Sequence, residues 1–397
     1  MNLHDQYLSL RTLTVFAGIR KDAVITALES LLTADPEKQE EFVGRYCAFT
    51  AALYERDTDW SRYLHALVME DDNICVRQAA VKQPLGALLE DSLAQELITL
   101  TALSRLTSDQ VTEKLNYNGY LPRWETSAYD FSADYQAHLK ELPRKGYGIF
   151  ARYHAFRIEN GQLAPILCPD PQRLDELVRY EREREPVIAN TRAFLQGLPA
   201  NNVLLYGDAG TGKSSTVKAI ANEYKDQGLR LIEIKQSQLK EIPNVLETLA
   251  GNPLHFILFI DDLSFDSGND EFIALKNILE GGASHTRGNV LIYATSNRRH
   301  FVKEDASVRS GSEMFVNDTI QETMSLAARF GLTVTFQKPK KSLYIEIVEA
   351  LADRYGIQMD REQLITEAEA FAIRASGRSP RTARQFIDTV NIRTHLQ

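Results

Sequence analysis

The sequence has few cysteines, no long apolar run and no net positive charge. The three cysteines, Cys47, Cys75 and Cys168, are odd in number and far apart, so they suggest neither a disulfide framework nor a zinc site. We expect them to be buried, reduced thiols. No apolar run approaches the ~18 residues of a membrane span, and polar residues such as Asp5 stand where a secretory signal would be basic and then apolar. The sequence therefore favours a cytoplasmic protein without a membrane-spanning helix.

The balance of charge limits the classes of partner. The net charge is −9, which argues against broad adhesion to nucleic acid or anionic membranes but leaves room for a local basic surface. Hydrophobic residues make up 44% and charged residues 25% of the chain, as in soluble globular proteins. Because 397 residues exceed one ordinary domain, we expect two or three.

The most informative stretch is NVLLYGDAGTGKSST, residues 202–216. Its apolar start predicts a buried parallel strand, and the turn that follows matches G-x-x-x-x-G-K-[ST]. Glycines there let backbone N–H groups surround phosphate oxygens, while Lys213 would reach the β and γ phosphates and the Ser214 hydroxyl would bind Mg²⁺. A glycine turn with a chance lysine is the alternative, which the flanking strand and helix disfavour. The residues predicted to bind nucleotide are Gly207, Asp208, Ala209, Gly210, Thr211, Gly212, Lys213, Ser214 and Ser215.

Strand and helix patterns alternate after residue 201, which predicts an α/β fold with a parallel sheet and helices on both faces. The strand candidates are 203–206, 229–234, 256–261, 290–295 and 332–336, with helical stretches that include 245–249 and 272–279.

Two of these strands end in polar residues, at the edge where a parallel sheet presents its ligands. After the third, Asp261 is expected to hold the Mg²⁺ shell and Asp262 to orient or deprotonate the attacking water. The fourth ends in TSN, and Asn297 is our preferred residue for reaching the γ-phosphate or the water. The alternative is that the aspartates merely end a strand or cap the next helix, and that Asn297 caps the segment NRRH.

The first part of the chain carries no recognisable chemistry. Residues 1–115 read as amphipathic helices, and the composition then shifts, at about 116–160, to aromatics, glycine and arginine. Rings such as Phe150 and Phe156 among arginines would suit single-stranded nucleic acid, but a packed element or a partner-docking element is the favoured interpretation. Three prolines within 163–171 predict a linker. A helix should follow, broken or restarted near Pro186, with the charged run 181–185 on a solvated face.

The order of these segments resembles the AAA+ ATPases. The similarity rests on the phosphate loop, the strand with DD, the TSN strand, SLAARFGL and GRSPRTARQF. In detail, ANNVLLYGDAGTGKSS, ILFIDDLSF, LKNILEGG and NVLIYATSNRRH are similar to a bacterial AAA+ family known only as an ATP-binding domain of unknown function. The resemblance covers about residue 163 to the C-terminus. With it we expect a mainly helical N-terminal domain over 1–162, a nucleotide-binding core over 163–338 and a helical lid over 339–397.

The resemblance also implies roles for single residues. Residues 207–214 look like the Walker A loop, Asp261 and Asp262 like Walker B, and Asn297 like sensor 1. Arg329, in SLAARFG, stands where the family places an arginine finger that reaches the nucleotide of a neighbouring subunit. An arginine that forms a salt bridge at a helix end is the alternative for this position.

In the C-terminal segment, Arg381 resembles sensor 2, which contacts the γ-phosphate from the lid. Ser379 and Pro380 predict an N-cap and a first helical residue, so Arg381 would lie in the first turn. A cation is unfavourable there unless an anion lies nearby. Arg384, one turn further on, is the reserve candidate.

The implied function is an AAA+ ATPase that binds ATP and Mg²⁺ between core and lid. The resemblance implies a homo-oligomer, and we expect it to remodel or regulate an unknown protein partner through the N-terminal domain. Most AAA+ hydrolases carry Asp-Glu at Walker B, whereas this chain has Asp261-Asp262, so a nucleotide-gated switch with weak hydrolysis stays open. A DNA-linked loader or initiator is a further alternative, and a P-loop small-molecule kinase is the least favoured.

Overall fold

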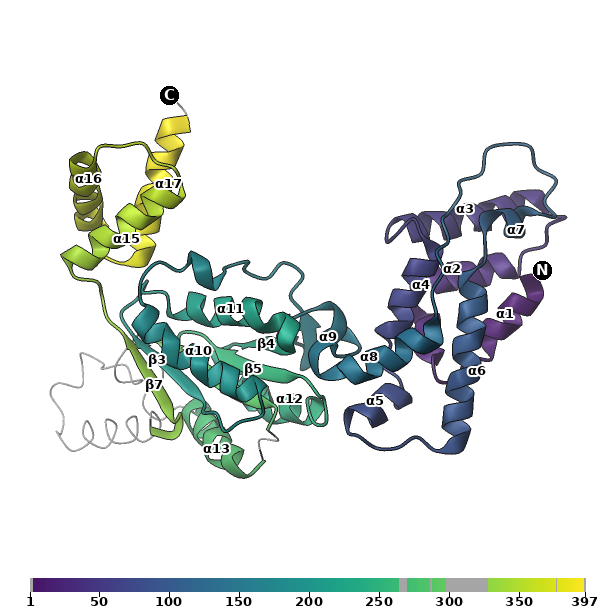
Figure 1. Cartoon of the computed structure of the whole chain (residues 1–397), viewed down its shortest axis with the longest axis horizontal. Helices are drawn as coiled ribbons and strands as arrows, with labels where there is room; N and C mark the ends of the chain where they lie inside the picture. Colours follow the sequence, from purple (N-terminus) through teal and green to yellow (C-terminus); the bar gives the residue numbers. More distant parts are fainter. Residues whose placement is uncertain (1–2, 264–269, 286–287, 298–327, 376, 396–397) are drawn as a thin grey trace. The chain divides into compact units, whose positions relative to one another are not determined.

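The computed structural model describes residues 3–263, 270–285, 288–297, 328–375 and 377–395 (Figure 1). The chain divides into two compact units. One comprises Met1–Arg152 with Gly251–Pro253, and the other comprises Tyr153–Ala250 with Leu254–Gln397. Each unit has its own hydrophobic core, which is the property that defines a domain.

The first unit is helical, as predicted for residues 1–115. Large aromatic side chains fill its core, and Phe49 packs edge-on against Trp60 with ring centroids 5.6 Å apart. The buried indole N–H of Trp60 donates to the Leu103 carbonyl at 3.0 Å, so this polar group is satisfied. The helices are α1 (Leu3–Arg11), η1 (Ala17–Lys21), α2 (Ala23–Leu32), α3 (Gln39–Tyr54), α4 (Trp60–Met69), α5 (Ile74–Ala80), α6 (Ala87–Ser104), α7 (Ser108–Thr112), α8 (Phe131–Lys145) and α9 (Ile149–Arg152).

The second unit is built on a seven-stranded sheet in the order β2-β1-β4-β5-β6-β3-β7. All neighbours are parallel except β1 and β2. The predicted α/β fold is confirmed. The strands are β1 (Ala155–Glu159), β2 (Gln162–Pro165), β3 (Val203–Gly207), β4 (Leu229–Ile234), β5 (His255–Ile260), β6 (Val290–Ser296) and β7 (Leu332–Phe336). The helices between them are η2 (Leu174–Glu176), α10 (Glu181–Leu195), α11 (Lys213–Tyr224), η3 (Lys225–Gln227), η4 (Gln236–Glu241), α12 (Ile242–Thr248) and α13 (Asp270–His285).

The five strands predicted after residue 201 are all present, but β1 and β2 were not predicted. They lie in the aromatic segment and at the start of the predicted linker. Burial accounts for β1, since Phe156 is fully buried and Ile158 nearly so, while Arg157 faces outward and pairs with Glu159. Strand β2 has no buried residue and is held by its antiparallel pairing with β1. The two units accordingly divide between residues 152 and 153, whereas the sequence predicted a boundary after 162. With Phe156 and Phe150 buried, these two rings are not free to stack on bases.

Three local expectations need correction. Helix α10 is not broken at Pro186 but begins at Glu181 and runs through the proline, which leaves the carbonyl of Arg182 without its usual helical N–H donor. Arg184, in the charged run expected to face solvent, is buried. The cysteines are free, but Cys168 is exposed and only Cys75 is fully buried.

After β7 the chain passes directly into three helices that gather together (Figure 1). They are α15 (Lys341–Arg354), α16 (Arg361–Arg374) and α17 (Pro380–His395), and they agree with the helical lid predicted over 339–397. Ser379 caps α17, because its hydroxyl accepts from the Thr382 N–H at 3.0 Å, and Pro380 is the first helical residue, as predicted. Among the described residues, no helix has the length and apolarity needed to cross a membrane.

Candidate nucleotide-binding site

The glycine-rich loop joins β3 to α11, and close packing requires its first glycine. Gly207 has φ +132°, and a Cβ there would lie 2.0 Å from the carbonyl oxygen of Phe336 on β7. Strand β7 runs parallel to β3, so its end passes directly beside the start of the loop. Gly210 and Gly212 also adopt left-handed conformations, which side chains disfavour. The loop therefore turns sharply and presents its backbone at the start of α11.

Lys213 lies at the centre of the site and is only 5% exposed. Its ammonium donates to the carbonyl oxygens of Gly207 and Asp208, each at 2.8 Å, and to Asn297 Oδ1 at 2.9 Å. Burial lowers the pKa of this ammonium, and the carboxylates of Asp208, Asp262 and Asp261 oppose that shift. A buried cation held by neutral oxygens is suited to an additional anionic ligand.

The two consecutive aspartates meet the ends of two other elements. Ser214 Oγ and Thr295 Oγ1 both donate to Asp261 Oδ1 at 2.6 Å. Asn297 Nδ2 donates to Asp262 Oδ1 at 2.5 Å. Because Lys213 also contacts Asn297, the phosphate loop, both carboxylates and the end of β6 belong to connected hydrogen-bond networks.

The donor set fits magnesium. The Ser214 hydroxyl and an Asp261 carboxylate oxygen lie 2.6 Å apart, so both hard oxygens are available to one cation. Within the described ranges, no cluster of three or more His, Cys, Asp or Glu side chains is arranged to hold a metal. Magnesium in phosphoryl-transfer sites is held in this way, by one or two protein oxygens together with phosphates.

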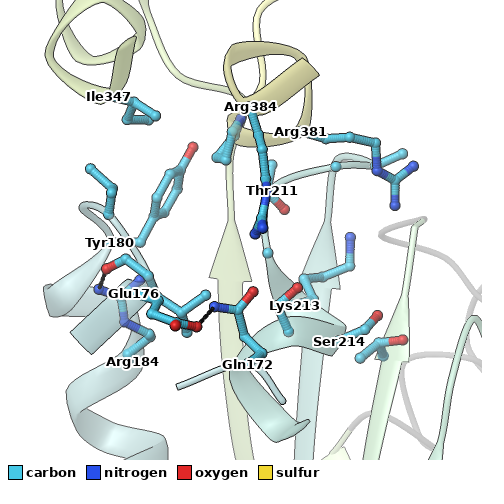
Figure 2. Close-up of a pocket in the computed structure, with 18 of the residues that line it drawn as sticks. Gln172, Glu176, Tyr180, Arg184, Thr211, Lys213, Ser214, Ile347, Arg381 and Arg384 are labelled. Atoms are coloured by element: carbon cyan, nitrogen blue, oxygen red, sulfur yellow. Dashed lines mark hydrogen bonds between the residues drawn. The ribbon is translucent and has the colours of Figure 1, made fainter. Parts of the chain in front are cut away.

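These residues line a cavity of about 450 Å³, a size suited to a nucleotide (Figure 2). In Figure 2, Arg381 and Arg384 extend from the lid side, opposite Lys213 and Ser214. The backbone N–H of Arg381 donates to the Gly210 carbonyl at 3.2 Å, so the start of α17 contacts the loop directly. Arg381, our sensor 2 candidate, and Arg384 both line the cavity.

Sequence reasoning missed the wall of the cavity on the other side. It is formed by residues before α10, by Arg184 in its first turn and by apolar side chains of α15, and no motif identifies them. Tyr180 donates its hydroxyl to the Gln337 carbonyl at 2.7 Å, and Arg354 of α15 donates to two carbonyls in η2. The lining residues on this side are Gln172, Glu176, Leu177, Val178, Tyr180, Arg184, Ile347 and Leu351.

Arg184 is the one residue on this wall that the charged run concealed. It is buried, donates to the Leu177 carbonyl at 2.9 Å and lies 3.7 Å from Glu181. Burial lowers the pKa of its guanidinium. The sequence signal that could have separated it from the run is its helical spacing with Tyr180, Val187 and Thr191, which are buried on the same side of α10.

Arg329 lies apart from this cavity. It precedes β7, and neighbouring Gly331 approaches Asn201, which precedes β3, so this is the amino end of the two strands. The cavity lies at their carboxyl ends. A contribution of Arg329 to the cavity of its own chain is therefore disfavoured. Residues 298–327, which include the part of NRRH after Asn297 and most of the stretch before Arg329, lie outside the described residues, so the capping alternative for Asn297 is not tested.

The contact between Gly210 and the lid gives a direct prediction. A Cβ at Gly210 would lie 3.0 Å from Ser379 Oγ and 3.3 Å from Arg381 Cβ, whereas a Cβ at Gly212 meets nothing within 4 Å. Both glycines have positive φ, so an alanine strains the backbone at either, by about 1–2 kcal/mol. We expect Gly210→Ala to weaken ATP binding more than Gly212→Ala does, because only the former displaces α17. Equal losses measured by titration would show that the lid contact contributes nothing.

Comparison with known proteins identifies the family. Residues 151–394 match the family described as "Protein of unknown function (DUF815)". The chain is a DUF815 protein. Among curated proteins it is similar to the replication factor C large subunit of Staphylothermus marinus, with 31% identity over 117 residues, 28% of this chain and 27% of the relative. It is also similar to proteasome-activating nucleotidase 2 of Haloferax volcanii, with 31% identity over 157 residues, 35% of this chain and 38% of that one.

This DUF815 protein thus spans only about a quarter to two fifths of the length of these two relatives. Solved structures with a similar fold include AMPPCP-bound DnaA from Aquifex aeolicus, at 17% identity and a TM-score of 0.40 over 56% of this chain and 66% of that one. Another is a Thermotoga maritima RuvB mutant, at 18% identity and a TM-score of 0.38 over 55% and 64%. The predicted relationship of this DUF815 protein to the AAA+ ATPases is confirmed.

Proposed function

We propose that this protein binds MgATP in the 450 Å³ cavity and hydrolyses it as an oligomeric AAA+ ATPase that remodels or regulates a protein partner. One observation carries the proposal. Lys213, Asn297 and Asp262 form one hydrogen-bonded chain, and Ser214 and Asp261 form another beside it. A buried cation, a metal-binding oxygen pair and a carboxylate for water are the parts that phosphoryl transfer to water requires.

The cavity offers distinct surroundings to the two ends of ATP. Loop residues Gly207 to Ser215 and the Lys213 ammonium would bind the phosphates through backbone N–H groups and charge. Arg381 and Arg384 add positive charge from the lid. Apolar side chains on the opposite wall, including Leu177, Val178 and Ile347, suit the flat faces of a base.

Ser214 and Asp261 would hold Mg²⁺, and a bound Mg²⁺ would neutralise negative charge on the phosphate oxygens. Asp262 would accept a proton from, or orient, the attacking water, and Asn297 would fix both the water and the carboxylate. The side-chain amide of Asn297 already links Lys213, which would contact the phosphates, to Asp262, which would contact the water.

Arg329 is proposed to act on the nucleotide of a neighbouring subunit. Arg329 lies at the amino end of β7, away from the cavity of its own chain. From this position it would contact a nucleotide bound by a second copy of the chain. A guanidinium from a neighbour stabilises the charge that develops on the transferring phosphoryl group. The partner itself is proposed to be a protein bound by the first unit, and nucleic acid is less favoured because Phe150 and Phe156 are buried.

The proposal is tested by ATP uptake and turnover together. Folded full-length protein is titrated with labelled ATP and Mg²⁺, and steady-state phosphate release is then followed across a range of protein concentrations. We expect saturable binding and a rate per subunit that rises as subunits assemble. Correctly folded protein that takes up no ATP would overturn the proposal.

A second candidate is a nucleotide-gated switch that hydrolyses poorly. The observation that favours it is the backbone of Asp262, whose φ of +52° lies in the left-handed region. Aspartate tolerates that region better than glutamate, so the shorter acid suits this turn even though it reaches less far toward a water. Tight ATP binding with negligible phosphate release at every concentration would favour the switch over the ATPase.

A further inference from the structure

Thr295, at the end of β6, contacts both aspartates through a single hydroxyl. Its Oγ1 donates to Asp261 Oδ1 at 2.6 Å and accepts from the backbone N–H of Asp262 at 2.9 Å. The side chain is only 2% exposed, so water does not compete strongly for these hydrogen bonds. The contact follows from the parallel pairing of β5 with β6, which places the end of one strand beside the end of the other.

The same residue also holds the turn that follows β5. The carbonyl oxygen of Thr295 accepts from the Leu263 N–H at 2.7 Å, so both oxygens of Thr295 bind the backbone after Asp261. Asp262 lies between these contacts with φ +52°, a left-handed conformation that is unfavourable for a residue with a side chain. Surrounding structure must hold such a backbone in place.

A metal at Ser214 and Asp261 would use the Ser214 hydroxyl, and the Asp261 carboxylate would then keep Thr295 as its hydrogen-bond donor. Partners of this kind fix which oxygen of a carboxylate faces a cation. The backbone hydrogen bond to Asp262 fixes, at the same time, the direction in which that carboxylate points toward Asn297.

We propose that Thr295 is a positioning residue for hydrolysis, which orients the metal-binding Asp261 and the water-binding Asp262 with one hydroxyl. This role rests on the proposed function. It assigns Thr295 neither to the phosphates nor to the base, so its loss should affect the metal and the chemical step while ATP affinity without metal is preserved.

The test compares Thr295→Val, which keeps the branched shape and removes the hydroxyl, with Thr295→Ser, which keeps the hydroxyl. For the valine variant we expect ATP affinity in EDTA within about twofold of wild type, but affinity of the ADP complex for Mn²⁺, read by paramagnetic resonance, about 10-fold weaker. We expect kcat to fall about 10- to 100-fold with KM for ATP nearly unchanged. Thr295→Ser should restore both properties to within about threefold of wild type.

Wild-type Mn²⁺ affinity and kcat in Thr295→Val would overturn the role, as would a serine variant as defective as the valine variant. If the valine variant does not fold, Thr295→Ala replaces it, and the same two readouts decide. Wild-type protein that takes up no ATP would instead overturn the proposed function, and the role of Thr295 with it.

Discussion

Replacing Lys213 with alanine is expected to abolish measurable ATP binding while the protein stays folded. Removing one member of a buried, hydrogen-bonded charge pair costs about 2–5 kcal/mol, so affinity should fall at least about 30-fold. The fold should persist because burial already disfavours the charged ammonium, as its lowered pKa indicates. Of its three partners, Asn297 lines the cavity, and Gly207 and Asp208 are not buried, so water can take the place of the ammonium.

Nucleotide-dependent melting measures both parts of this prediction. ATP with Mg²⁺ at 100 times the wild-type Kd stabilises wild type by about 2.7 kcal/mol, whereas a loss of affinity of about 30-fold or more leaves Lys213→Ala with about a third of that stabilisation or less. The rise in melting temperature with nucleotide should therefore be large for wild type and small or absent for the variant. Lys218→Ala is the matched control, because Lys218 lies on the same helix but pairs with Glu233 at 3.2 Å. A normal rise in melting temperature for Lys213→Ala would mean that the phosphates bind elsewhere.

The strands and the phosphate loop were predictable because their signals are local. A strand buried on both faces, such as β5, is recognised as a continuous apolar run. The loop is recognised from the spacing of its glycines and lysine over eight residues. Strand β1, AFRIE, is short, contains two charged residues and lies in an aromatic segment, so its composition resembled a loop. Its burial and its pairing with β2 and β4, which are contacts between separate segments, make it a strand.

The wall of the cavity formed by Tyr180 and α15 was not predictable for a different reason. Tyr180 and Ile347 line the same cavity although more than 160 residues of sequence separate them, and each is an ordinary aromatic or apolar residue in its own segment. Thr295 was visible at a strand end, but its contact with both aspartates depends on how β6 pairs with β5. Such sites form when strands and helices from distant segments pack together, and the sequence of one segment does not show which other segment will lie beside it.

Arg329→Ala is expected to be nearly inactive alone and to regain activity when mixed with Asp262→Asn. Loss of an arginine finger costs about 10³-fold or more in turnover, and loss of the water-orienting carboxylate should also stop the chemistry. In a mixed oligomer, the intact cavity of an Arg329→Ala subunit can receive the intact arginine of an Asp262→Asn neighbour. With equal amounts and head-to-tail contacts, about a quarter of the interfaces combine both intact parts.

Phosphate release from the mixture, compared with each variant alone, measures this recovery. The control replaces Asp262→Asn with the double variant Asp262→Asn, Arg329→Ala, which assembles in the same way but supplies no arginine, so the mixture should stay inactive. Normal turnover by Arg329→Ala alone would show that the arginine has no role in trans. If the two variants assemble but the mixture stays inactive, both residues act in the cavity of one chain. That outcome would contradict the prediction, because Arg329 lies at the amino end of β7 and the cavity lies at the carboxyl ends of the strands.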